Sequence, residues 1–77
     1  MRELLEYLAR QLVDHPDAVE VDEFDEDDGT RVLELAVAEE DYGKVIGRGG
    51  RTANALRLVI KAAAAKDNRR VFVDIVD

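Results

Sequence analysis

The sequence predicts one small two-layer α+β domain over residues 1–77, with its elements in the order α-β-β-α-α-β. An Asp-Gly pair at 28–29 separates two runs of alternating apolar and polar residues, which is typical of a β-hairpin. A glycine-rich loop at 47–50 separates two helical patterns, and a valine-rich strand follows. A helical crossover joins the second strand to the third, so we expect a three-stranded mixed sheet covered on one face by three helices.

The first half of the chain contains one helix and the hairpin. Residues 2–14 place leucines three and four positions apart, which predicts an amphipathic helix that a following proline terminates. The first strand is expected at 18–25, where Phe24 has the opposite parity to the valines. A bulge or an early end of the strand near Glu23 would resolve this mismatch. The second strand is expected at 30–38.

The second half contains the two remaining helices and the last strand. A short helix is expected at about 42–47, and Asp41 is a plausible N-cap for it. A longer helix should run from about Arg51 to Lys66, and the last strand should occupy 70–76.

The charges of the chain are unevenly distributed. The chain has 11 basic and 18 acidic residues and a net charge of −7, which argues against a polyanionic partner. Residues 43–66, however, hold six of the basic residues and no acidic residue. Binding depends on the local field rather than on the net charge, so this segment is a candidate phosphate-binding surface.

Composition excludes several classes of function. The chain has no Cys, which excludes disulfides and thiolate metal sites. His15 is the only histidine, and there is no Ser or Cys for it to activate. The acidic turn at 25–28 lacks the spacing of a calcium loop. We therefore expect no enzyme, no metal and no cofactor. With no membrane-spanning run and no signal-peptide pattern, we also expect a cytoplasmic protein.

The glycine loop has the features of an anion-binding site. Glycine allows a sharp reversal and lets a ligand approach the main chain closely. The helix that starts after Gly50 presents N–H groups and a partial positive charge, with Arg48 and Arg51 beside them. Val45 and Ile46 before the loop would provide an apolar wall for bases. The loop is therefore expected to bind a phosphate.

The run Val45-Ile46-Gly47-Arg48-Gly49-Gly50, between two helices and followed by a strand, resembles the V-I-G-x-x-G signature of KH domains. The helix and hairpin in front resemble the bacterial type II KH arrangement. The length, Y-G-K-V-I-G-x-x-G-R and the Ala-rich helix resemble the small single-KH-domain bacterial RNA-binding proteins of the KhpA/YlqC family. The resemblance implies that the G-x-x-G loop holds the backbone of single-stranded RNA and that an apolar groove holds the bases. Carried over by position, the RNA-binding residues are Lys44, Val45, Ile46, Gly47, Arg48, Gly49, Gly50 and Arg51.

The same resemblance implies a role and partners. It implies an RNA chaperone or post-transcriptional regulator, linked in some bacteria to cell elongation and division. It also implies a homodimer, or a heterodimer with a larger KH-containing protein of the KhpB/Jag type, and no small-molecule substrate.

Two features depart from the family pattern. Thr52 stands where a branched aliphatic residue is frequent, which could soften the packing under the loop. The acidic turn at 25–28 should repel phosphate, which favours moderate affinity with a steep salt dependence.

The long helix has two apolar faces. The core is expected to take the face that comprises Thr52, Leu56, Val59, Ile60 and Ala63. A separate strip has the spacing 3, 4, 3 and comprises Ala55, Leu58, Ala62 and Ala65, which is a candidate dimer seam. Simple alanine enrichment for helix propensity would produce the same strip. If the strip is a dimer seam, an alternative function is open. The chain would then be a protein-interaction module whose acidic surface has weakened or abolished RNA binding.

Overall fold

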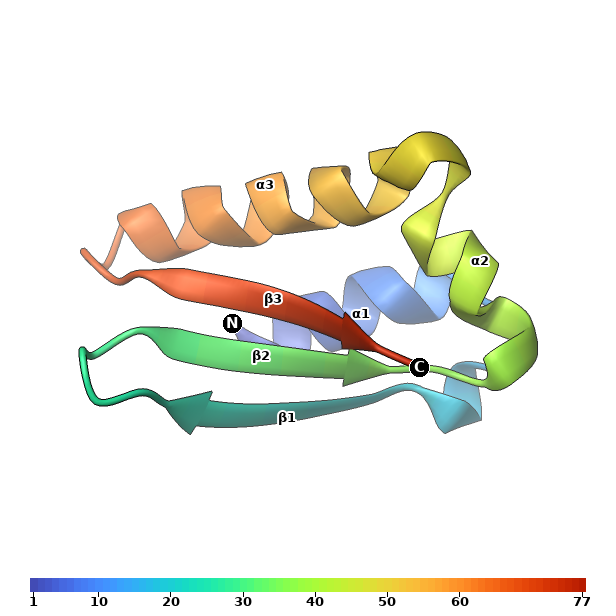
Figure 1. Cartoon of the computed structure of the whole chain (residues 1–77), viewed down its shortest axis with the longest axis horizontal. Coiled ribbons are helices and arrows are strands. Elements are labelled where there is room, and N and C mark those ends of the chain that lie inside the picture. The colour runs from blue at the N-terminus through green and yellow to red at the C-terminus, as the bar shows by residue number, and fades with distance from the viewer.

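The computed structural model describes residues 1–77 and has the predicted order of elements (Figure 1). The helices and strands are α1 (Arg2–Leu12), β1 (Glu20–Asp25), β2 (Arg31–Ala36), α2 (Tyr42–Ile46), α3 (Arg51–Ala65) and β3 (Val71–Val76). Short 3₁₀ turns precede β1, α2 and α3. The sheet has the order β1-β2-β3, with β1 and β2 antiparallel and β2 and β3 parallel. The expected mixed three-stranded α+β architecture is confirmed.

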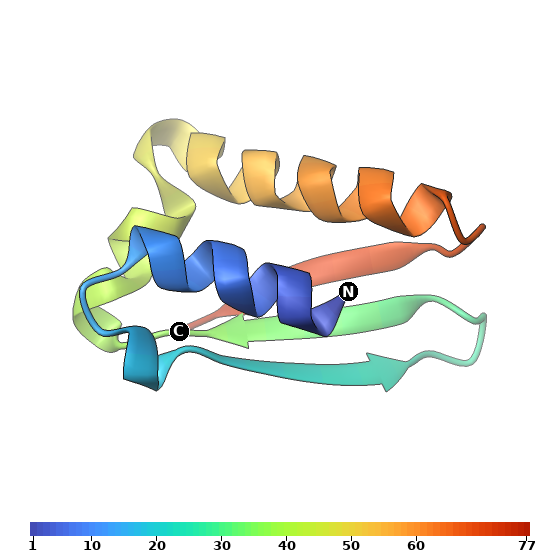
Figure 2. The ribbon, with the colours of Figure 1, turned by 180° about the vertical axis from the view of Figure 1, so that it is seen from behind.

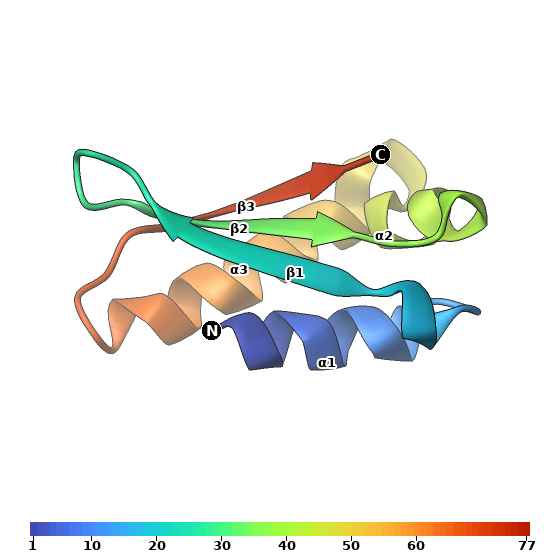
Figure 3. The same ribbon diagram turned by 90° about the horizontal axis from the view of Figure 1, so that it is seen from below.

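The three helices leave one face of the sheet free (Figures 2 and 3). α1 and α3 lie side by side on one face (Figures 2 and 3), and the other face carries no helix. The five-residue α2 is too short to cross the sheet, and it packs at its end against α3 and α1. This position places the connection between α2 and α3 at one end of the molecule. None of the helices has the length and apolar character needed to traverse a lipid bilayer.

The first strand keeps its register without a bulge. Pairing continues to its last residue, with Phe24 opposite Val32 and Asp25 opposite Arg31. The expected bulge or early end near Glu23 was therefore wrong. Phe24 instead lies on the helix-free face of the sheet, where side chains of its parity point.

The core lies between the covered face of the sheet and the two long helices. Leu5 of α1, Leu33 and Leu35 of β2, and Ile60 of α3 are fully buried in one cluster. Val45 of α2 is fully buried with them. The loop that follows α2 is thus anchored by a core residue two positions before Gly47.

The buried face of α3 differs from the expected one. Its buried residues are Ala53, Leu56, Ile60 and Ala64, whereas Val59 is 45% exposed and Thr52 is only partly buried. The small side chains at 53 and 64 let the helix approach the sheet closely, which rotates the buried face toward them. In α1 likewise, Leu5 and Ala9 are buried, and the helix ends at Leu12 because Val13 is already extended.

Candidate nucleic-acid interface

Three glycines with positive φ reverse the chain between α2 and α3. The N–H of Gly47 donates to the carbonyl of Gly43 over 2.8 Å and ends α2, with Gly47 at φ 76° and ψ 170°. The N–H of Gly50 then donates to the carbonyl of Gly47 over 3.1 Å. Gly49 and Gly50 have φ of 63° and 80°. These conformations favour glycine and form a tight single-turn corner.

The glycines have two different physical roles. A Cβ at Gly47 would collide with both the side chain and the backbone of Thr52. A Cβ at Gly49 or Gly50 would meet no heavy atom within 4 Å. Gly47 is therefore required for packing, with Thr52 filling the space beneath it, while Gly49 and Gly50 leave the main chain open to a ligand.

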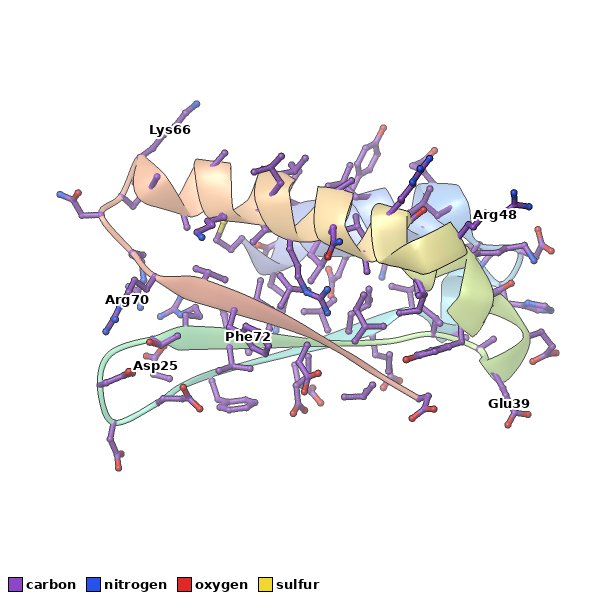
Figure 4. All side chains as sticks on the ribbon, turned by 45° about the horizontal axis from the view of Figure 1, so that its top comes forward. Asp25, Glu39, Arg48, Lys66, Arg70 and Phe72 are labelled. Atoms are coloured by element: carbon purple, nitrogen blue, oxygen red, sulfur yellow. The ribbon has the colours of Figure 1, made fainter.

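The loop carries two arginines that are free of carboxylates. Arg48 and Arg51 are exposed, and neither forms an ion pair. Arg48 extends from the loop end of the molecule in Figure 4. Gly50 occupies the N-cap of α3 and provides no side-chain cap, while the N–H of Arg51 donates to the carbonyl of Arg48. The start of the helix presents its positive dipole end at this point. Together these groups can seat an anion such as a phosphate.

Two carboxylates lie beside Lys44, one of the predicted RNA-binding residues. Its ammonium group lies 3.3 Å from Oδ2 of Asp14 and 3.7 Å from Oδ1 of Asp41. These two carboxylates partly neutralise it, so it is a poorer phosphate ligand than the unpaired arginines. The contact with Asp14 could not be expected from the local pattern, because Asp14 lies thirty positions earlier in the chain.

A buried carboxylate holds α2 against the connection that follows α1. Asp41 is fully buried and accepts hydrogen bonds from the backbone N–H groups of Asp14 at 3.2 Å and His15 at 2.9 Å. Nδ1 of His15 lies 3.0 Å from its Oδ2. Asp41 stands at the N-cap position of α2, as expected, but its side chain makes no capping hydrogen bond. It fixes the start of the short helix that leads into the glycine loop.

Hydrogen bonding shifts the pKa of both partners. The hydrogen bond to Asp41, with the charge of that carboxylate, raises the pKa of His15 above its ordinary value of 6.5. Burial acts to raise the pKa of Asp41, but the hydrogen bonds from His15 and from the Asp14 backbone together outweigh it. The pKa of Asp41 therefore lies below its ordinary value of 3.8.

The guanidinium group of Arg57 links α3 to the edge strand β3. Nε of Arg57 donates to the carbonyl of Val73 on this edge over 3.1 Å, and its Nη1 donates to Oδ1 of Asn54 over 3.3 Å. Sequence reasoning missed both polar residues, although they lie three positions apart and so share one side of the helix. Ile46 of α2 is partly buried, whereas Val45 belongs to the core.

A hollow of about 440 Å³ lies beside α2. The hollow is lined by Val37, Glu39, Tyr42 and Asp77. Two carboxylates border it, so phosphate is disfavoured there, while the ring of Tyr42 offers a surface for stacking.

The acidic hairpin turn lies far from the glycine loop, at the opposite end of the sheet (Figure 1). Asp25 pairs with Nε of Arg31 at 2.9 Å and with Arg69 at 3.6 Å. Asp28 pairs with Arg70 at 3.6 Å. Because of both distance and pairing, the turn should repel RNA at the loop less than the sequence suggested.

The outer side of α3 presents the predicted seam to solvent. Ala55, Leu58, Ala62 and Ala65 are all exposed, and Leu58 is 68% exposed. Between α1 and α3 lies an apolar hollow of about 250 Å³, lined by Leu8, Gln11, Leu12, Thr52, Ala55, Leu56 and Val59. This hollow borders the seam, so the apolar surface is wider than the heptad strip alone.

Comparisons with known proteins agree with this geometry. The family model described as "KhpA/KhpB, KH domain" matches residues 2–75. An RNA-binding protein KhpA of Clostridium acetobutylicum is 55% identical over 76 residues, which are 99% of this chain and 100% of that protein. The RNA-binding protein KhpA of Halalkalibacterium halodurans is 54% identical over 77 residues, with both chains fully covered.

A solved structure of a larger protein shares the fold. The protein is Era, in a complex with MgGDPNP and a segment of 16S ribosomal RNA, and the match has a TM-score of 0.57 at 18% identity. It covers 96% of this chain but only 28% of Era. The likeness therefore concerns the fold of part of Era alone.

Proposed function

The chain belongs to the KhpA/KhpB family of KH domains, and on that premise we propose that it binds short single-stranded RNA. The observation that carries the proposal is the open corner at Gly49 and Gly50, flanked by the unpaired guanidinium groups of Arg48 and Arg51. Its local charge is positive in a chain with a net charge of −7. RNA is therefore directed to this end of the molecule.

The mechanism is capture of the backbone followed by weaker contacts to the bases. A phosphate lies against the open main chain of the loop, where the two arginines and the start of α3 neutralise it. Bases then rest on Ile46 and Tyr42, and Asn54 and Arg57 at the β3 edge offer hydrogen bonds to their edges. Backbone contacts dominate, so sequence specificity is low and affinity falls steeply with salt.

The biological role that suits such binding is that of an RNA chaperone or post-transcriptional regulator in the cytoplasm. In this proposal the protein is not an enzyme, because it remodels or protects RNA through reversible contacts alone. A connection to cell elongation and division is part of the same proposal.

The test reverses the charge of the loop without touching the core. In the double variant Arg48→Glu, Arg51→Glu, affinity for a short unstructured RNA should fall by at least about tenfold in a low-salt anisotropy titration. A glutamate in the first turn of α3 suits the helix dipole, so the fold should hold, as circular dichroism can verify.

The matched control changes the charge by the same amount elsewhere. Arg10→Glu, Lys66→Glu alters two exposed, unpaired cations, of which Lys66 lies at the other end of α3 from Arg48 (Figure 4). This control should lose much less affinity than the loop variant. An equal loss in the two variants would mean that RNA responds to total charge and that the loop is not the site.

We further propose that a second copy of the chain covers the outer side of α3. The alanines let two helix backbones come close, and the 68%-exposed Leu58 would be buried at the centre of the pair. A heterodimer with a larger KH-containing protein would use the same surface. This seam also carries the alternative function, an interaction module with no RNA binding.

The variant Leu58→Asp tests the dimer seam, and RNA binding by the unaltered protein tests the alternative function. Light scattering should show a dimer for the unaltered protein and a folded monomer for the variant, because an aspartate would be buried in the seam. Ala18→Asp adds the same charge at an exposed site off α3 and should stay dimeric. If the unaltered protein forms dimers and binds no RNA at low salt, the interaction module is the correct function.

A further inference from the structure

The helix-free face of the sheet has an ordered pattern that neither the RNA site nor the α3 seam uses. Figure 3 shows α1 and α3 on one side of the strands only. Phe24 of β1, Val32 of β2 and Phe72 of β3 are directly opposite one another in the register. Phe24 is 43% exposed and Phe72 is 52% exposed, while Val32 is buried between them. We call these three residues the aromatic row; Figure 4 labels Phe72 on the side of the sheet away from α3.

A second row of the same face is entirely acidic. Asp22, Glu34 and Asp74 are directly opposite one another across β1, β2 and β3, and we call them the acidic row. It lies two residues from the aromatic row along each strand, a separation of about 7 Å. None of the three carboxylates has an ion-pair or hydrogen-bond partner. Glu20 adds a further acid on this face.

The acidic row costs stability in the isolated chain. Like charges that are directly opposite on neighbouring strands repel one another, and here the central carboxylate has one on each side. The fold does not need them, since the core lies on the other face. The three do not form a cluster that could hold a metal ion. A cationic partner would remove the repulsion.

The pattern selects one kind of occupant. RNA is repelled by the acidic row, and a second copy of this chain would bring a second acidic row. A basic amphipathic helix fits both rows, since its apolar stripe can cover the aromatic row while a flanking line of Lys or Arg reaches the acidic row. Side chains three or four positions apart on a helix are about 5–6 Å apart, close to the roughly 4.8 Å between strands.

We propose that the helix-free face of the sheet is a docking surface for a basic amphipathic helix of another protein. The aromatic row anchors it and the acidic row selects its charge. The site lies on the opposite side of the sheet from α3, so docking leaves both the glycine loop and the α3 seam accessible. This proposal does not depend on RNA binding.

The probe is a fluorescent synthetic peptide of leucine and lysine, patterned as an amphipathic helix, titrated into the full chain at low salt. The double variant Asp22→Asn, Asp74→Asn should bind it about fivefold more weakly or worse, as expected for the loss of two exposed ion pairs. Phe72→Ser should weaken it roughly tenfold through lost apolar burial. In a labelled sample, backbone amides of the two rows should shift on binding and those of residues 47–51 should not.

Matched controls separate a site from general attraction to an acidic protein. Glu3→Gln, Asp17→Asn removes two exposed, unpaired acids off the sheet, and Tyr7→Ser removes a 60%-exposed aromatic ring of α1. Both should bind the peptide within about twofold of the unaltered chain. Equal losses in the controls and the face variants, or equally tight binding of a peptide of lysine alone, would overturn the proposal.

Discussion

The conformation of Gly47 is the most restrictive single-residue feature of the candidate site. Its φ of 76° and ψ of 170° lie in a region that only glycine occupies without strain. Its Cα lies so close to Thr52 that no Cβ would fit between them. Gly47→Ala should therefore cost about 1–3 kcal/mol in backbone strain alone, with the collision adding to it. Urea unfolding measures the change in the free energy of unfolding.

Gly43 provides the matched control for this prediction. It lies in α2, and a methyl group there would meet no neighbour within 4 Å. Gly43→Ala should leave stability unchanged or raise it by about 0.5–1 kcal/mol, because alanine suits a helix better. A Gly47→Ala protein as stable as Gly43→Ala would contradict the described loop conformation.

The pair of His15 and Asp41 should make stability depend on pH. The pKa of His15 is raised above 6.5, so the stabilisation it provides is complete below that pH and is lost as pH rises through the raised value. The pKa of Asp41 is lowered below 3.8, so its stabilisation is present above that pH and is lost on further acidification. The pair should therefore stabilise the fold most between about pH 3.8 and pH 6.5.

His15→Gln isolates the contribution of the imidazole, because glutamine can donate a hydrogen bond but does not titrate. The stability difference between the unaltered protein and this variant should be larger at about pH 5.5 than at about pH 9 in thermal unfolding. A difference that is constant across this range would show that the His15 ring does not bond Asp41 in its charged form.

At the scale of elements, the sheet should be more stable when the acidic row loses its central charge. Glu34→Gln relieves repulsion from both neighbouring strands and should raise the free energy of unfolding by about 0.2–1 kcal/mol at low salt. High salt should abolish the gain by screening. Glu20→Gln removes an acid of the same face that is opposite Ala36 instead, and it should change stability less. An equal gain in both variants would assign the effect to net charge.

The elements also differ in how well the sequence predicted them. Strand parity was reliable, because the period of two places Leu33 and Leu35 on one face and Phe24 on the other. The prediction of which face of α3 is buried was not reliable, since Ala53 and Ala64 are buried while Val59 is half-exposed. Hydrophobicity favours burial of the larger side chain, whereas close packing of a helix on a sheet favours a small side chain at the contact.

At the scale of the whole molecule, the order of elements and the glycine corner could be predicted, because both depend on local sequence patterns. The neutralisation of Lys44 by Asp14 and the hydrogen bonds between Asp41 and His15 could not be predicted. Their partners meet only when α1 and α2 pack together. The same holds for the bond from Arg57 to the β3 edge. Long-range polar contacts thus decide which of the predicted cations remain free to bind RNA.

The charges of the folded molecule are divided between its surfaces. Unpaired cations lie at the glycine loop and along α3, and unpaired acids lie on the helix-free face of the sheet. An RNA strand and a basic helix can therefore be held at once on different sides of a chain of 77 residues. The acidic sheet also directs RNA away from itself and toward the loop.

Backbone capture at the glycine corner is tested most directly by following every amide of the isotope-labelled chain as short single-stranded RNA is added at low salt. Amides of residues 47–51 should shift first and furthest, those of Asn54 and Arg57 should follow, and the acidic row should stay unchanged. Addition of salt should reverse the shifts. Shifts confined to other surfaces, or none at the loop while the protein remains folded, would contradict backbone capture at this corner.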